Sequence, residues 1–343
     1  MPTKKVLPKS SKNWKDVRSK TKIKKKTQLA LLVLGILIVF LILSQVMRFT
    51  QSLVGSKKYS WDGQYNINLL IRSKDISLLT YSPTDNKIIM VNIPDETFLQ
   101  LPYGFGSWQA RSIYDLGESQ KRGGNKLLKE TLTAFFAIPV DGYLDISSLK
   151  STETVSDLVD VLRKNPVSGI SLLSQLKTDL TMWELLKLKW GMASVRFDKI
   201  KQLDLVELNV LQKETLADGT PIFTSDPIKM DSVLADFQDP KVATEGKTIA
   251  VFNSTDQPQL AQKWARLVTN LGGDVIIVSN TKTKLKRTQV SGEQSLTLKR
   301  LQQIFVLDCQ NSPKCDNISP TEDDIAYQRA QINLLLGEDY ISR

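Results

Sequence analysis

The chain has 343 residues, of which 41% are hydrophobic and 24% are charged. This length suits about two folded domains. The sequence contains no histidine and only two cysteines. These counts exclude catalytic Ser-His-Asp and Cys-His groups, histidine-ligated metals and zinc sites with four cysteine ligands. The formal net charge is +10.

The positive charge lies in a basic tail, residues 1–28. Eleven Lys and Arg residues and a single acid, Asp16, occur before residue 27, so the rest of the chain holds 35 bases and 35 acids. The tail therefore indicates a topology signal beside anionic lipid, and we expect no nucleic-acid partner, although such a tail could also bind DNA or RNA.

Residues 29–47 are the one long apolar segment, and their 19 residues carry no charge. As a helix they would extend ~28 Å, about the thickness of a bilayer core. The basic residues before this segment predict a single-pass protein of the cell membrane, with a cytoplasmic N-terminus and residues 49–343 extracytoplasmic. A cleaved signal peptide is the alternative, with a weak cleavage site between Ser52 and Ser56. We expect an uncleaved signal anchor.

Residues 48–64 are polar and mixed, as expected of a juxtamembrane linker. Three strands are then predicted, at Tyr65–Arg72, Asp75–Ser82 and Lys87–Ile93, and the second and third form a hairpin around the turn residues 83–86. After a loop rich in Gly and aromatic residues, we expect a helix at Lys126–Phe136 and a strand at Ile138–Ile146.

The sequence pattern of residues 147–245 predicts secondary structure less clearly, and it leaves open whether these residues belong to the first domain. Helices are expected at Ser151–Lys164 and Leu172–Gly191. Residues 197–226 have strand character, with a turn signal at Asp218-Gly219.

Residues 246–343 predict a small α/β module. Its core is a β-α-β unit, in which the crossover helix implies parallel strands. The expected elements are Thr248–Asn253, Gln259–Leu271, Asp274–Ser279, Leu296–Phe305 and Gln331–Leu336.

Residues 66–146 resemble a LytR–CpsA–Psr domain. The likeness lies in the strand INLLI, the segment VNIPDET, the loop PYGFG, the segment YDLGE and the segment AIPVDGYLDI. The segment IAVFNSTDQPQLAQKWARLVTNLGGDVIIVS resembles the C-terminal module that often follows such a domain. On this likeness we assign residues 65–245 to an α/β LytR–CpsA–Psr-like domain and residues 246–343 to a LytR C-terminal-like domain.

The resemblance implies an Mg²⁺-dependent phosphotransferase that moves a glycopolymer from a polyprenyl-pyrophosphate lipid to the cell wall. Such a site needs carboxylates for the metal and arginines for the pyrophosphate. This sequence departs from the family there. Asp95 and Glu96 stand where the family has an Arg-Asp pair, Ser73 replaces an Arg, and Gln109 and Arg111 replace Lys and Asn.

A rearranged site remains open. Asp75, Asp95 and Glu96 would be its catalytic acids, with Asp75 as a metal ligand. The phosphates would lie against Arg72, Arg111, Lys121 and Arg122. The alternative is that these side chains are solvated loop residues.

Cys309 and Cys315 have five residues between them in DCQNSPKCD. On the oxidising, exported side they would form a small-loop disulfide, the alternative being two thiols.

The sequence therefore predicts a membrane-anchored protein of the cell envelope with a diverged, catalytically impaired domain. Its C-terminal module would bind a wall polymer or an envelope protein. The alternatives are an active glycopolymer phosphotransferase and a purely structural scaffold, so the sequence leaves enzymatic activity open.

Overall fold

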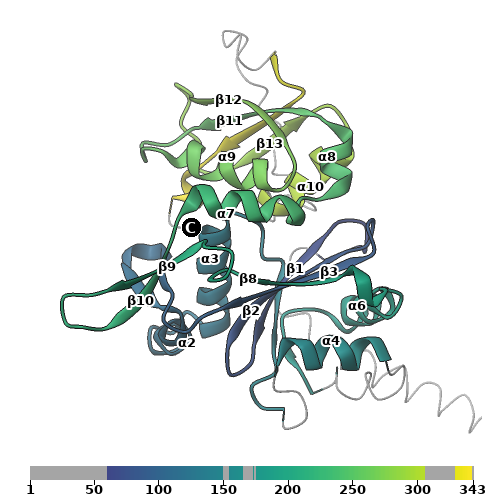
Figure 1. The fold of residues 1–343 in the computed structure, drawn as a ribbon. Coiled ribbons are helices and arrows are strands. Elements are labelled where there is room, and N and C mark those ends of the chain that lie inside the picture. The colour runs from purple at the N-terminus through teal and green to yellow at the C-terminus, as the bar shows by residue number, and fades with distance from the viewer. Residues whose placement is uncertain (1–59, 150–153, 165–172, 174, 306–328, 342–343) are drawn as a thin grey trace, which may run out of the picture. The chain divides into compact units, whose positions relative to one another are not determined.

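The computed structural model describes residues 60–149, 154–164, 173, 175–305 and 329–341 (Figure 1). All of these belong to one compact unit, Ser56–Arg343. The basic tail, the predicted span and both cysteines lie outside the described residues. Among the helices that are described, none combines the length and hydropathy needed to cross a bilayer.

A mixed six-stranded sheet organises the first part of this unit, in the order β7-β6-β1-β2-β3-β8. Its centre is an antiparallel meander, and β6 and β8 add parallel strands beside β1 and β3. The strands are β1 (Ile67–Arg72), β2 (Ile76–Ser82), β3 (Lys87–Ile93), β6 (Gly142–Asp145), β7 (Lys177–Thr178) and β8 (Ile200–Asp204). The three meander strands confirm the sequence prediction, and β7 and β8 show that residues 147–245 complete the same sheet.

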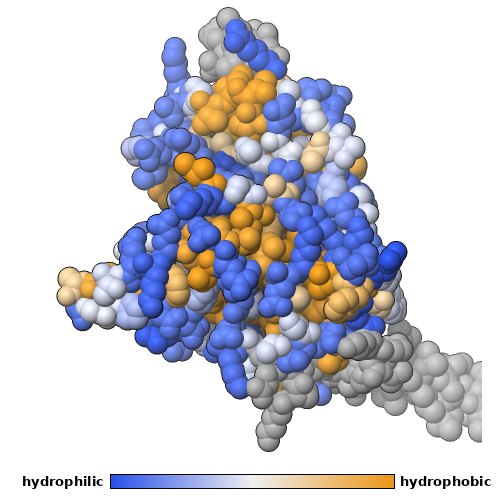
Figure 2. Space-filling view, in the orientation of Figure 1, coloured by the Kyte–Doolittle hydropathy of each residue, from blue (hydrophilic) through white to orange (hydrophobic). Residues whose placement is uncertain are grey.

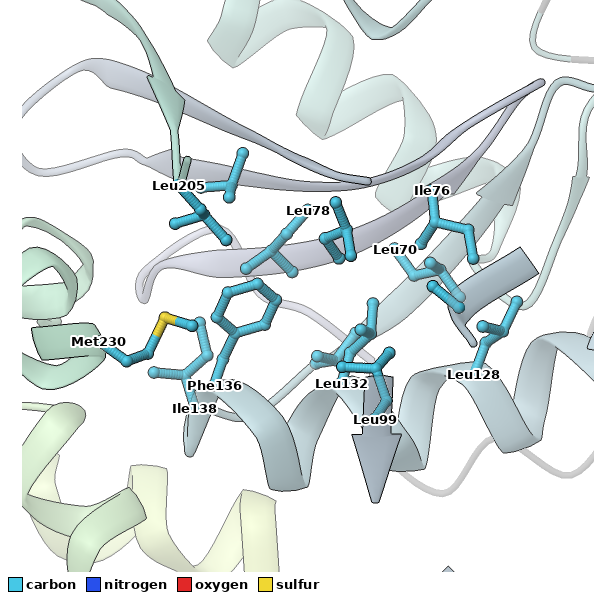
Figure 3. Close-up of a cluster of buried hydrophobic side chains, with 14 of the residues drawn as sticks. Leu70, Ile76, Leu78, Leu99, Leu128, Leu132, Phe136, Ile138, Leu205 and Met230 are labelled. Carbon is cyan, nitrogen blue, oxygen red and sulfur yellow. The ribbon is translucent and has the colours of Figure 1, made fainter. Parts of the chain in front are cut away.

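Both faces of this sheet are covered, and β1 and β2 are buried almost throughout, including their few polar side chains. Helices α2 (Ala110–Ser119) and α3 (Gly124–Phe136) cover one face, where Leu70 and Leu78 of the sheet meet Leu128, Leu132 and Phe136 of α3 (Figure 3). Helices α4 (Val155–Lys164) and α6 (Met182–Ala193) cover the other face.

Three local features differ from the sequence prediction. Helix α6 begins ten residues later than expected, because Thr181 and Glu184 form a capping box that fixes its first turn. The segment predicted as a loop contains a short hairpin, β4 (Phe98–Gln100) and β5 (Ser107–Gln109), followed directly by the unpredicted α2. Trp61 lies within the expected linker, yet its side chain is buried.

The remaining elements before residue 247 are short. They are η1 (Pro102–Gly104), η2 (Phe197–Lys199), β9 (Leu211–Thr215), β10 (Pro221–Ser225), α7 (Pro227–Leu234), η3 (Ala235–Phe237) and α8 (Pro240–Glu245). Strands β9 and β10 form the hairpin that the Asp218-Gly219 turn predicted.

The C-terminal module has a four-stranded sheet in the order β12-β11-β14-β13, and β11 is parallel to both of its neighbours. Its elements are β11 (Thr248–Asn253), α9 (Leu260–Asn270), β12 (Asp274–Asn280), β13 (Gln289–Gly292), α10 (Leu296–Phe305), β14 (Ile332–Leu336) and η4 (Glu338–Tyr340). The β-α-β prediction is confirmed, and β13 is an addition to it. Apolar residues gather over the edge strand β12, where Ile276 and Val278 are half-exposed (Figure 2).

Candidate functional site

The candidate site begins where β1 and β6 end. These strands are parallel, and their register places Arg72 opposite Asp145. The guanidinium of Arg72 donates to the Asp145 carboxylate at 2.9 Å and to the Ser147 hydroxyl at 3.0 Å. Asp145 is only 2% exposed. Adjacent carboxyl ends of parallel strands are a common position for ligand sites in α/β folds.

The environment of Asp145 favours its ionised form. Burial alone would raise the pKa of this carboxyl. The hydroxyl and backbone N–H of Ser147, together with the Arg72 guanidinium, outweigh burial and hold the pKa below its ordinary value. Arg72 and Asp145 therefore form a charged pair at neutral pH.

Helix α2 places an aromatic ring against this pair. The guanidinium carbon of Arg72 lies 3.6 Å from the centroid of the Tyr114 ring, within the range of a cation–π contact. The same ring passes so close to Gly124, the first residue of α3, that a Cβ there would meet Tyr114 Cδ2 at 2.5 Å. The Gly123-Gly124 sequence thus lets α2 and α3 approach closely.

A group of acids lies at the neighbouring end of β2 and β3. Burial, followed by the charges of Asp75 and Glu96, raises the pKa of Asp95, and Arg111 offsets this only in part. Arg111 is tied to the same loop, since its backbone N–H donates to the Asp95 carbonyl at 3.3 Å. Three predicted acids and one predicted base therefore form one electrostatic group.

The turn between α2 and α3 carries the two other predicted bases, Lys121 and Arg122, both exposed. The Arg122 guanidinium carbon lies 3.9 Å from the Tyr103 ring centroid, and the Tyr103 hydroxyl donates to Glu130 at 2.9 Å. Tyr103 has a φ of 64°, in the left-handed region that most side chains avoid. Such backbone strain is often found at ligand sites.

The acids do not fit a magnesium centre on their own. Across the described ranges, no three Asp, Glu, His or Cys side chains converge closely enough to hold a metal ion. Asp75 and Glu96 act on Asp95 through charge without forming such a group with it. We therefore derive no catalytic step through Mg²⁺.

Sequence reasoning missed Asp145, Ser147 and Tyr114. A signal for Asp145 was present, because it is the penultimate residue of the predicted strand Ile138–Ile146, which would lie parallel to the first strand if the intervening helix is a crossover. Tyr114 gave no comparable signal, since α2 itself was not predicted.

Comparison with known proteins identifies the C-terminal module. Residues 247–340 match the family model described as LytR cell envelope-related transcriptional attenuator. Among curated proteins, none matches the chain.

Several solved structures resemble about half of the chain. TagV of Bacillus subtilis is 15% identical, covering 50% of this chain and 94% of its own, with a TM-score of 0.39. The LytR-CPS2A-psr family protein TagT with bound octaprenyl pyrophosphate is 16% identical, covering 51% and 90%, with a TM-score of 0.35. A transcriptional regulator from Enterococcus faecalis is 13% identical, covering 61% and 88%, with a TM-score of 0.38.

The structural neighbours thus include a named LytR–CpsA–Psr protein, but scores this low do not by themselves assign residues 65–245. The family match is independent of them and agrees with the module predicted at residues 246–343. Residues 247–340 are therefore similar to the family described as LytR cell envelope-related transcriptional attenuator.

Proposed function

We propose that the chain is a membrane-anchored protein of the cell envelope. In this proposal residues 65–245 are a diverged LytR–CpsA–Psr-like domain that binds a polyprenyl-linked glycopolymer or its pyrophosphate but transfers it poorly. The LytR C-terminal domain would contact a wall polymer or an envelope protein. The N-terminus would be cytoplasmic and residues 49–343 extracytoplasmic.

The observation that carries the proposal is the pairing of Arg72 with Asp145. A pyrophosphate that approached Arg72 would meet a guanidinium already neutralised by a buried carboxylate 2.9 Å away. Breaking this pair would leave Asp145 buried beside a new anion, which is unfavourable. Arg72 is therefore a weaker phosphate ligand than an arginine without an acidic partner.

The acids around Asp95 also weaken the binding of a pyrophosphate. The sequence resemblance places Asp95 and Glu96 where an Arg-Asp pair would contact the substrate. The raised pKa of Asp95 reflects burial and negative charges that Arg111 does not fully compensate. A ligand carrying several negative charges would be repelled by this group.

One observation favours the second candidate, an active phosphotransferase. A carboxyl with a raised pKa at the edge of a sheet is a suitable general base for a sugar hydroxyl. Asp95 has this property, and Arg111 lies beside it.

The test uses the full chain in phospholipid nanodiscs. Binding of polyprenyl pyrophosphate is titrated with and without Mg²⁺, and transfer of a labelled polyprenyl-linked glycopolymer to peptidoglycan is followed in the same preparation. We expect saturable binding with little or no transfer. Arg122→Gln should weaken binding, whereas Arg196→Gln should not, because Arg196 is an exposed arginine directly before η2, outside the candidate site.

Rapid, Mg²⁺-dependent transfer that Asp95→Asn abolishes would establish the phosphotransferase instead. Equal affinity of the wild type and of Arg122→Gln for the ligand would show that the ligand does not bind at this site.

A further inference from the structure

Helix α6 carries an outward stripe in which two tryptophan rings are exposed and two further side chains are partly buried. Trp183, Leu186, Lys187 and Trp190 follow one another at the spacing of a single helical face. Trp183 is 58% exposed and Trp190 is 59% exposed, and their rings meet edge to face at 6.2 Å between centroids. The helix lies on the outer side of the large sheet, beside α4 (Figure 1).

The stripe contributes little to the stability of α6. The opposite side of the helix buries Leu185, Leu188 and Met192 in the core. Its first turn is fixed by the capping box of Thr181 and Glu184. Two large indole rings therefore remain in solvent without a role in packing, and clustered exposed apolar groups usually mark an interaction surface.

The composition of the stripe suits the boundary of a lipid bilayer. Tryptophan prefers this boundary, because its ring is apolar while its indole N–H can still reach water. Lys187 lies between the two tryptophans, with its Nζ 5.9 Å from the Trp183 ring centroid. A lysine at such a position can direct its ammonium group toward anionic lipid headgroups.

Trp61, near the start of the described residues, contacts α6. The backbone N–H of Trp61 donates to Glu184 Oε1 at 2.6 Å, and Lys187 Nζ donates to the Trp61 carbonyl at 3.4 Å. Trp61 follows Met47, the last residue of the predicted span, by 14 residues. A chain of this length reaches at most roughly 50 Å even when fully extended. Helix α6 thus holds Trp61, which lies within 14 residues of the predicted span in the sequence.

We propose that the stripe formed by Trp183, Leu186, Lys187 and Trp190 lies in the headgroup region of the membrane that anchors the chain. The occupant of this surface is the bilayer, and anionic lipids strengthen the contact through Lys187. The inference rests on the proposed membrane anchoring. It adds that the exported domain is held against the bilayer rather than on a loose tether.

The experiment places the full chain in nanodiscs of phosphatidylcholine and phosphatidylglycerol, with bromine on the acyl chains close to the headgroups. Bromine quenches tryptophan fluorescence only at short range. We expect bromolipid to quench the wild type, and Trp183→Phe/Trp190→Phe to lose the part of the quenching that these rings contribute. Trp108→Phe is the matched control, since Trp108 is also exposed but lies in β5. It should leave the quenching unchanged.

Lys187→Gln provides a second readout that does not depend on removing a tryptophan. Quenching in this variant should fall more in discs that contain phosphatidylglycerol than in discs of phosphatidylcholine alone. Near-ultraviolet circular dichroism confirms that each variant is folded.

If the chain enters the discs but the double variant is quenched as strongly as the wild type, the stripe is not at the membrane. Self-association through the stripe, abolished by the double variant, would assign the surface to a second copy. If the chain fails to enter the discs, the anchoring itself is wrong and this inference fails with it.

Discussion

Strand β6 carries an arginine–aspartate pair at each end, and the two pairs differ in their surroundings. At the carboxyl end Asp145 pairs with Arg72, whose side chain is 26% exposed. Just before the other end Asp141 pairs with Arg300 of α10, and here the arginine side chain is fully buried. The first pair lies within the candidate site, whereas the second joins the large sheet to the C-terminal module.

The buried pair is part of a larger contact between the two sheets. Arg300 also donates to the Asn66 carbonyl at 3.2 Å, and the Asn66 backbone N–H donates to Asp239 at 2.8 Å. Glu245 accepts the backbone N–H groups of Leu296 and Thr297 at the start of α10. The comparison teaches that the same ion pair can be structural or available to a ligand, depending on whether water can replace the lost partner.

The largest effect is expected from the buried pair. Arg300→Met leaves Asp141 buried without its cation and should lower the free energy of unfolding by ~3 kcal/mol or more. Denaturant titration of the full chain in detergent measures this. Lys299→Met, on the same helix but half-exposed, is the matched control and should change stability by less than about 0.5 kcal/mol. Equal effects of the two substitutions would contradict a structural role for Arg300.

A smaller effect is expected at the other end of the strand. Arg72→Met should lower the free energy of unfolding by about 1 kcal/mol, because Ser147 still donates two hydrogen bonds to Asp145 and the space vacated by the partly exposed Arg72 side chain is open to water. The same titration applies. A loss as large as that of Arg300→Met would show that this pair is also structural.

The Asp145 carboxyl should also produce a pH dependence. Because its pKa in the folded state lies below the ordinary value of 3.8, the ionised group stabilises the fold at higher pH. This contribution is lost as the pH falls from 3.8 through the folded pKa. The stability difference between the wild type and Asp145→Asn should therefore shrink on acidification. A difference that stays constant over that range would contradict the assignment.

The smallest effect is expected at Asp95, where the pH dependence of stability has the opposite sign to that at Asp145. Its raised pKa means that ionisation destabilises the folded state, so stability falls as the pH rises from 3.8 through the folded pKa. At neutral pH, Asp95→Asn should therefore be more stable than the wild type, by no more than roughly 0.5 kcal/mol because the carboxyl is only partly buried. Thermal unfolding at neutral and acidic pH measures the difference. A less stable variant at neutral pH would show that Asp95 has a favourable partner.

Local patterns in the sequence were sufficient to predict most of the longer helices and strands. The prediction was right for strands β1 to β3 and for the module elements Thr248–Asn253 and Leu296–Phe305. In these segments the spacing of the apolar residues indicates which positions are buried. Helix α2 was missed because its small and polar residues give no clear apolar periodicity. Its one buried side is formed by Ala110, Ile113 and Gly117.

The pairs at the site could not be predicted in the same way. Arg72 and Asp145 are 73 residues apart, and Asp141 and Arg300 are 159 apart. Contacts between residues so far apart in the chain cannot be inferred from a single sequence. The one local clue was Arg300 itself, a base between the buried Leu298 and Leu301 of an amphipathic helix. A buried base on an apolar face calls for an acidic partner, but the pattern does not identify it.

The central claim is that acids within the site oppose a pyrophosphate ligand. Asp95→Arg restores positive charge at the position where the resemblance places an arginine, and Asp95→Ala removes the acid without adding charge. The most direct measurement is the affinity of each full-length variant for polyprenyl pyrophosphate in nanodiscs, together with its rate of glycopolymer transfer. The account predicts that affinity rises from the wild type to Asp95→Ala and again to Asp95→Arg, and that transfer does not fall. Loss of an existing transfer activity in Asp95→Ala would contradict it.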